Sequence, residues 1–191
     1  MSSLTAFLEE LNDSILQPGT VETDPASIAY SMAIEFGARL TSAEVFDNFI
    51  PGPVAGEGKS RRRFRIDGYQ IDETDGSVHL AITDFASSGE VCTITKGDVE
   101  SIFRQAEHYV EICQEGSIWD RKSSVNEQVE LSSYLEKSSE SITRFRFHLF
   151  TNREISKQLR ELDAGEIGGI VSDYQIWDLG RMNSLALSAI G

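Results

Sequence analysis

Three carboxylates could carry out chemistry in this chain. Asp67 and Asp84 fall on the two strands of a predicted β-hairpin, and Glu35 falls on the helix before it. Hydrolysis of a phosphodiester needs carboxylates that hold a divalent metal, because the metal neutralises the phosphate and activates a bound water. We therefore take Glu35, Asp67 and Asp84 as candidate catalytic residues and metal ligands, with Mg²⁺ as the expected cofactor.

Nucleases of the PD-(D/E)xK type use this kind of arrangement. Their Asp lies on the first strand of a hairpin, and the second strand carries an acidic residue or Gln followed two positions later by Lys. A Glu often comes from the preceding helix. Helix, hairpin, helix and strand, the order predicted for this chain, is also the order of that core fold.

A structural interpretation of the same carboxylates stays open. Asp67 could accept hydrogen bonds from the backbone or pair with Arg65 or Arg146, and Asp84 could cap the turn at residues 86–89. Acidic residues at strand ends commonly do this, since a short carboxylate reaches nearby backbone N–H groups. In this interpretation the carboxylates stabilise the hairpin and bind no metal.

The chain is strongly acidic, with 31 acidic against 17 basic side chains and a net charge of -14. Such a charge repels phosphate wherever the surface is not locally basic, so any nucleic-acid site must be a local patch. The candidate contacts for DNA or RNA are Lys59, Arg61, Arg62, Arg63 and Arg65. The alternative is a loop and strand edge that face water, as short runs of charge usually do.

The spacing of apolar residues predicts a mixed α/β order of elements. Helical spacing covers residues 4–15, 25–46, 97–113, 125–135, 155–162 and 178–190. Alternation predicts a hairpin at 63–85 with its turn at Asp75-Gly76, and strands at 142–151 and 170–177. Proline and glycine predict a loop at 50–60, and glycine predicts a turn at 165–169. The last two strands should form a parallel crossover, within a mixed central sheet flanked by helices.

The length of 191 residues fits one domain, with residues 1–24 as a helix and linker and 25–191 as the core. We expect this domain to be the N-terminal part of a longer protein, because the final helix is apolar. Its C-terminal remainder would then be a partner. No membrane-spanning run, no secretory signal and only two cysteines predict a cytoplasmic location. The three histidines have no ligand spacing, so metal binding through histidine is not expected.

Several segments resemble the N-terminal region of the abortive-infection phage-resistance (AIPR) proteins. They are Arg65–Tyr69, Val78–Phe85, Phe147–Asn152 and Ile176–Met182, within a resemblance that covers roughly residues 28–187. Members of this family are longer bacterial proteins associated with phage defence. The resemblance implies a restriction-endonuclease-like core of the PD-(D/E)xK type, and it places this chain at the N-terminal domain.

The resemblance also marks where this chain departs from nuclease-like members, whose second strand carries Gln-x-Lys before an aromatic residue. Asp67 matches the metal-binding Asp and Phe85 the aromatic residue, whereas Ile82 stands at the Gln position and Asp84 at the Lys position. An aspartate cannot replace a lysine that stabilises developing negative charge. Two functions follow: a Mg²⁺-dependent nuclease with an altered site, or a non-catalytic domain that supports assembly or regulation of the larger protein.

Overall fold

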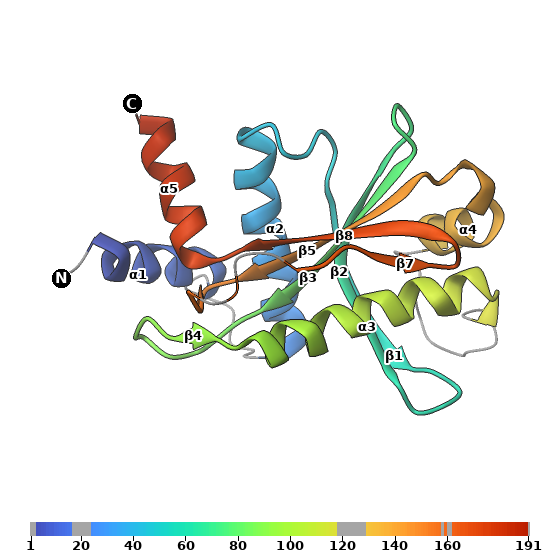
Figure 1. The fold of residues 1–191 in the computed structure, drawn as a ribbon. Coiled ribbons are helices and arrows are strands. Elements are labelled where there is room, and N and C mark those ends of the chain that lie inside the picture. Colours follow the sequence, from blue (N-terminus) through green and yellow to red (C-terminus); the bar gives the residue numbers. More distant parts are fainter. Residues whose placement is uncertain (1–2, 17–23, 118–128, 158, 160–161, 191) are drawn as a thin grey trace.

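A mixed six-stranded sheet forms the centre of the computed structural model, which describes residues 3–16, 24–117, 129–157, 159 and 162–190 (Figure 1). The strand order is β1 (Ile50–Glu57), β2 (Arg63–Asp72), β3 (Ser77–Asp84), β5 (Arg144–Thr151), β8 (Ile170–Trp177) and β7 (Gly165–Ile167). The first three strands are antiparallel, β3, β5 and β8 are parallel, and β7 runs antiparallel to β8. A separate parallel pair joins β4 (Thr93–Ile94) to β6 (Glu154–Ile155).

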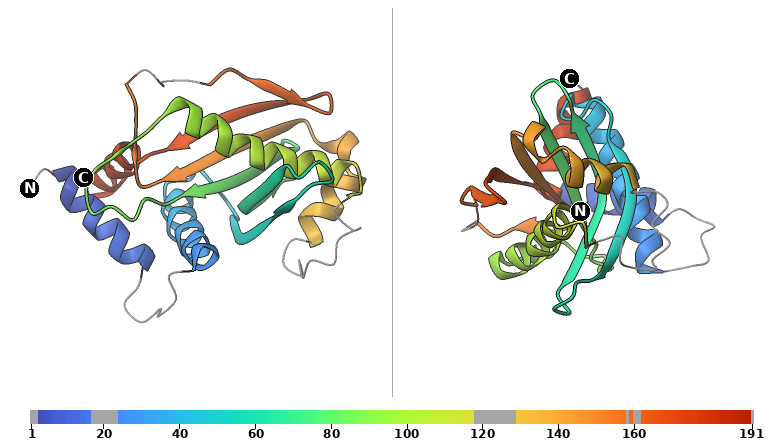
Figure 2. Two further views of the ribbon diagram at one scale, coloured as in Figure 1. Left: turned by 90° about the horizontal axis from the view of Figure 1, so that it is seen from below. Right: turned by 90° about the vertical axis from the view of Figure 1, so that its right-hand side faces the viewer.

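Five α-helices flank the sheet within the described residues. They are α1 (Ser3–Leu16), α2 (Pro25–Ser42), α3 (Lys96–Gln114), α4 (Val129–Lys137) and α5 (Leu179–Ile190). A short 3-10 turn at Ser139–Ser141 follows α4. The right-hand view of Figure 2 places the sheet between α3 and α2, so the sheet is covered on both faces. No helix in the described part of the chain is long and apolar enough to cross a membrane.

The helix starts follow from the sequence. Asp24 caps α2 by accepting a hydrogen bond from the backbone N–H of Ser27, and Pro25 occupies the first turn, where its missing N–H costs nothing. Thr95 and Asp98 form a capping box at the start of α3, in which each side chain bonds the other residue's backbone. Both helices therefore begin at positions that the sequence specifies locally.

Strand alternation sorts the core into two clusters. The first lies between the sheet and α3 and contains Leu80 of β3, Phe147 of β5 and Phe103 of α3. The second lies on the other face and contains Phe150 of β5 with residues of α1, α2 and α5. Successive residues of one strand therefore belong to opposite clusters, because successive side chains point to opposite faces of a sheet.

Most of the predicted elements are confirmed, including the hairpin, the parallel pairing of β5 with β8 and the final helix. The predicted loop at 50–60 is wrong, since β1 occupies most of it. The predicted helix at 155–162 is wrong, since Ile155 ends β6 and none of the described residues between 156 and 162 is helical; residues 158, 160 and 161 lie outside the described residues. The turn predicted at 165–169 begins as strand β7. The helix predicted to reach residue 46 ends at Ser42, and Glu44 follows with a φ of 58°. Residues 125–128 of the next predicted helix lie outside the described residues.

Candidate functional site

Asp67 is completely buried on β2 and bridges to β3. Its Oδ2 accepts hydrogen bonds from the backbone N–H of Thr83 at 2.7 Å and from the Thr83 hydroxyl at 2.9 Å. The guanidinium of Arg65 lies 3.3 Å from the same oxygen. The regular β2–β3 pairing ends at Gly68 and Ala81, so the Asp67 side chain continues the bonding between the two strands.

The environment of Asp67 disfavours its charge. Burial raises the pKa of Asp67 above its usual value, although Arg65 and the hydrogen bonds from Thr83 act in the opposite direction. The second oxygen, Oδ1, is buried and has no hydrogen-bond partner. A carboxyl group in this position suits a structural link better than a site that must carry a full negative charge.

Asp84 lies at the end of β3 and binds Arg153, which follows β5. Its Oδ1 accepts from Nη2 of Arg153 at 2.6 Å, and its Oδ2 accepts from Nε at 2.8 Å. The Thr151 hydroxyl donates to Oδ2 at 2.8 Å. These hydrogen bonds raise the pKa of Arg153, and both side chains of the pair are mostly buried. The bidentate pair therefore connects the ends of two parallel strands.

Glu35 lies on α2 and makes a third, separate interaction. Its Oε1 accepts from Nε of Arg39 at 2.7 Å, one helical turn away, and Arg39 also contacts Glu10 of α1 at 3.2 Å. Glu35 thus belongs to a network that joins α1 to α2. The structure gives Glu35, Asp67 and Asp84 different partners rather than a shared centre.

These carboxylates do not fit a shared Mg²⁺ site as they are arranged. Among the described residues, no group of three His, Cys, Asp or Glu side chains could hold a metal ion together. Arg153 and Thr151 already occupy the oxygens of Asp84, and the bonded oxygen of Asp67 is held by Thr83. Mg²⁺ binding here stays a prediction.

A cavity of about 340 Å³ lies beside Asp84. The start of α2 contributes apolar side chains, and the polar walls include Arg65, Thr83 and Asp84. Arg65 donates to the backbone carbonyl of Thr83, while its Nε is buried without a partner. The cavity contains Asp84 and Arg65, yet both side chains are engaged by protein groups.

The predicted basic patch is divided by the structure. Lys59, Arg61, Arg62 and Arg63 are exposed at the β1–β2 turn, which projects from the body of the domain (Figure 1). Arg62 forms an ion pair with Glu111 of α3 at 3.4 Å, and the two side chains are 55% and 41% exposed. Arg65 instead turns inward to Asp67 and Thr83. Of the predicted basic patch, the residues of the turn are therefore the ones exposed to solvent.

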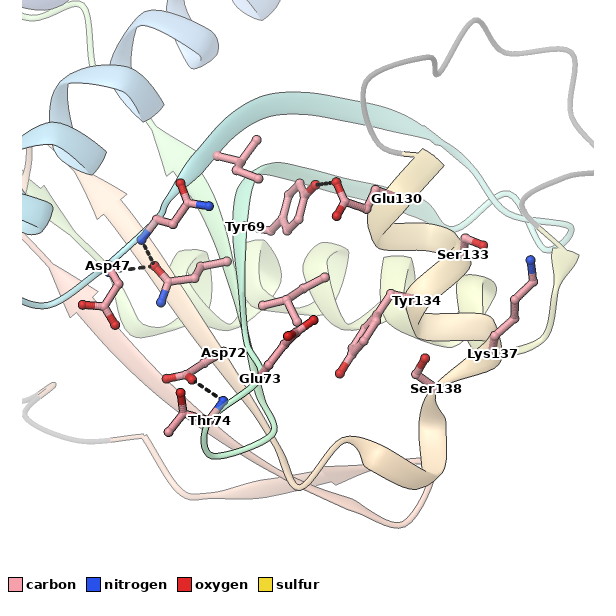
Figure 3. Close-up of a pocket in the computed structure, with 14 residues that line it drawn as sticks. Asp47, Tyr69, Asp72, Glu73, Thr74, Glu130, Ser133, Tyr134, Lys137 and Ser138 are labelled. Carbon is pink, nitrogen blue, oxygen red and sulfur yellow. Dashed lines mark hydrogen bonds between the residues drawn. The ribbon is translucent and has the colours of Figure 1, made fainter.

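A second cavity, of about 700 Å³, lies between β2, the β2–β3 turn and α4 (Figure 3). Tyr69 and Tyr134 contribute aromatic walls, and the Tyr69 hydroxyl donates to Glu130 at 3.4 Å. Burial and the Glu130 carboxylate raise the pKa of Tyr69. The charged residues of the lining are four carboxylates and one ammonium: Asp47, Asp72, Glu73, Glu130 and Lys137. This cavity repels phosphate, and no spacing in the sequence indicates it.

Comparison with known proteins identifies the family. A family model described as the abortive infection phage resistance protein N-terminal domain matches residues 5–184. The chain belongs to this family. The matched AIPR N-terminal region runs from α1 into α5 and so includes the whole sheet and each candidate carboxylate. No curated protein and no solved structure matched the chain.

The AIPR resemblance predicted the position of Asp84 but not its partner. Arg153 lies 69 residues further along the chain and meets Asp84 only because β3 and β5 pair in parallel, with Asp84 opposite Thr151. The order of predicted strands allows this pairing without specifying its register. Arg153 and Thr151 are therefore residues of the site that sequence analysis missed.

Proposed function

We propose that this chain is a non-catalytic N-terminal domain of an abortive-infection phage-resistance protein, in which a restriction-endonuclease-like core supports assembly or regulation of the larger protein. The carrying observation is the bidentate contact of Asp84 with Arg153. Asp84 stands where nuclease-like members carry a catalytic lysine. An anion that is already neutralised by a guanidinium cannot supply the positive charge that such a lysine provides.

The arrangement of the elements supports the proposed core. Helix α2 precedes the antiparallel strands β1, β2 and β3, and α3 precedes β5, which pairs with β3 in parallel. Helix, hairpin, helix and strand is the order of the PD-(D/E)xK core. Asp67 and Asp84 lie on the two strands of the hairpin, as expected for that core, but each is bonded within the protein.

Cleavage would require the bond between Asp84 and Arg153 to be exchanged. Mg²⁺ prefers carboxylate oxygens in near-octahedral geometry, so Asp84 would have to leave Arg153, whereas Asp67 has only its buried Oδ1 to offer while Oδ2 stays bonded to Thr83. The released Arg153 would then lack its counter-ion in a mostly buried position. The folded arrangement favours the bonded form, which supports the non-catalytic proposal over a Mg²⁺-dependent nuclease.

The test is a cleavage assay on the purified chain with Mg²⁺ and with Mn²⁺, using single- and double-stranded DNA and RNA. We expect no cleavage by the natural sequence or by its Asp67→Ala variant. Cleavage that disappears in Asp67→Ala but persists in a control such as Asp173→Ala, a carboxylate of β8 that pairs with Arg144, would overturn the proposal. Circular dichroism of each sample establishes that it is folded.

Nucleic-acid binding is assigned within this proposal to the exposed β1–β2 turn. A variant with Lys59, Arg61 and Arg63 changed to Ser should lose any salt-dependent binding of DNA or RNA, because these side chains supply the phosphate contacts. A control variant, Arg104→Ser on α3, removes one exposed positive charge outside the turn. Equal binding by the natural chain and the triple variant would exclude the turn as the contact surface.

A further inference from the structure

Two buried histidines form a direct hydrogen bond inside the sheet. His79 of β3 and His148 of β5 place Nδ1 and Nε2 respectively 3.0 Å apart, with their rings stacked at 5.2 Å. The Trp177 indole N–H donates to Nδ1 of His148 at 3.1 Å. The Ser77 hydroxyl lies 3.3 Å from Nε2 of His79. All four side chains belong to buried residues, so water does not complete the chain of bonds.

Elementary hydrogen-bond chemistry assigns the protons. Indole nitrogen only donates, so Nδ1 of His148 must accept and the His148 proton must sit on Nε2. That proton is donated to Nδ1 of His79, which leaves the His79 proton on Nε2, facing Ser77. Both rings are therefore neutral and both carry the proton on Nε2. No other pair of neutral tautomers satisfies all three contacts.

A surface carboxylate lies beside the Ser77 end of this chain of donors. Asp75 accepts from the backbone N–H of Ser77 at 2.8 Å, and hydrogen bonds from Ser77 hold the pKa of Asp75 below its usual value. The Ser77 hydroxyl oxygen can accept the Nε2 proton of His79 because a hydroxyl both donates and accepts. The donors thus point in one direction, from Trp177 through the two histidines to Ser77.

An added proton cannot be accommodated by this arrangement. Protonation of His79 gives its Nδ1 a proton that faces the Nε2 proton of His148. Moving the His148 proton to Nδ1 would direct it at the Trp177 N–H. Either rearrangement creates two donors in contact, so one partner has to move.

We propose that Ser77, His79, His148 and Trp177 form an acid-sensitive latch, which holds the start of α5 on the sheet and releases it when either histidine is protonated. Trp177 immediately precedes Asp178, whose carboxylate caps α5 by accepting from the backbone N–H of Arg181 at 2.9 Å. The guanidinium of Arg181 lies over the Trp177 ring at 3.6 Å from its centre. Displacement of Trp177 is therefore transmitted to the first turn of α5. This latch does not depend on the proposed function.

The groups around the latch determine how easily it accepts a proton. Burial and the guanidinium of Arg146 on β5 lower the pKa of His79, whereas Asp75, Asp72 of β2 and Asp173 of β8 raise it. For His148, burial lowers the pKa most strongly, and His79, Arg146 and Arg181 act in the same direction. From the segment between α2 and β1, the ring of Phe46 packs against both histidines and adds an apolar cover.

The sign of the pH dependence follows from these lowered pKa values. Histidine in an unfolded chain takes up a proton near pH ~6.5, while the buried pair remains neutral to lower pH. The unfolded state then binds more protons than the folded state, so stability falls as the pH drops below about 6.5 and continues to fall through the folded pKa values. The latch is closed at neutral pH.

Nitrogen-15 NMR of the histidine rings in the intact chain tests the protonation states directly. We expect His79 and His148 to be neutral with the proton on Nε2 at about pH 7. A charged ring, or a proton on Nδ1 of either residue, would overturn the proposal. This measurement uses the natural sequence, so it does not depend on how well any variant folds.

Tryptophan fluorescence tests the release of α5. In a Trp119→Phe background, which leaves Trp177 as the only indole, we expect a reversible change in emission as the pH is lowered from about 7 to below the ordinary histidine pKa of ~6.5, through the lowered pKa values of the buried pair. His148→Gln should abolish this change, because a glutamine amide can accept from Trp177 and donate to His79 but does not titrate. His108→Gln is the matched control, since His108 lies on α3 beside Glu111 and should leave the change intact. An unaltered change in folded His148→Gln would refute the latch.

Discussion

Removal of the Asp84 carboxylate should destabilise the domain, because it leaves the Arg153 guanidinium without its counter-ion. The pair makes two contacts, at 2.6 and 2.8 Å, and the side chains of Asp84 and Arg153 are 16% and 21% exposed. Removing one partner of a fully buried pair costs about 3–5 kcal/mol, and an exposed pair contributes only ~0.2–1 kcal/mol. For this mostly buried pair we expect Asp84→Asn to cost about 2 kcal/mol.

Urea unfolding measures this loss. With a slope of about 2 kcal/mol per molar urea, the unfolding midpoint should fall by roughly 1 M. A double-mutant cycle with Arg153→Met should give a coupling free energy of about 1–2 kcal/mol. The control pair, Arg144 with Asp173, has side chains 45% and 30% exposed and should give about 0.5 kcal/mol or less.

The outcome bears on function as well as stability. Additive effects of Asp84→Asn and Arg153→Met would show that the two side chains do not stabilise each other in solution. The inference that Arg153 neutralises Asp84, at the position where nuclease-like members carry a lysine, would then be refuted. A coupling free energy in the expected range would support that reasoning, because it shows that the ion pair holds in solution.

Other substitutions test the core and the buried carboxyl group. Phe150→Ala should cost about 3–5 kcal/mol in urea unfolding, since its ring is fully buried. Gly68→Ala should lower the melting temperature, because an added Cβ would lie 2.3 Å from Cζ of Phe49, whereas Gly89→Ala, with nothing within 4 Å, should not. Asp67→Asn should reduce the pH dependence of stability in acid. Burial raises the folded pKa of Asp67 above its unfolded value. Between these two pKa values the natural chain therefore loses stability as the pH rises, and the Asn variant should not show this loss. Titration of the unfolding free energy from acidic to neutral pH checks the last prediction, and an unchanged slope in Asp67→Asn would contradict it.

Local signals in the sequence predicted much of the fold. The Asp75-Gly76 turn and the alternation on either side specify the β2–β3 hairpin, and Gly76 has the positive φ, 73°, that such a turn requires. β1 was missed because Pro51 and Pro53 are typical of loops. β1 is an edge strand of the sheet, where a missing backbone N–H is tolerated, and its pairing with β2 is irregular between Pro51 and Val54.

Side-chain interactions across the sheet were much less predictable. The sequence analysis predicted that Asp67 could bond to the backbone or pair with Arg65. Asp67 does both, since it accepts from the backbone N–H of Thr83 and pairs with Arg65. The same analysis predicted that Asp84 could cap a nearby turn and did not predict its ion pair with Arg153, because that pair depends on the parallel register of β3 and β5. The same register brings together two histidines that are 69 residues apart in the chain.

The position of α1 has a consequence for synthesis on the ribosome. Phe7 and Leu8 of α1 are buried in the same cluster as Leu179 and Met182 of α5. These apolar side chains of α1 leave the ribosome early, but the helix that completes their cover is translated more than 160 residues later. The second core cluster therefore cannot be completed before α5 has been synthesised, and the part of α1 that α5 covers stays exposed in the interval. A nascent chain stalled before residue 179 should bind chaperones through α1, and one that extends beyond α5 should not.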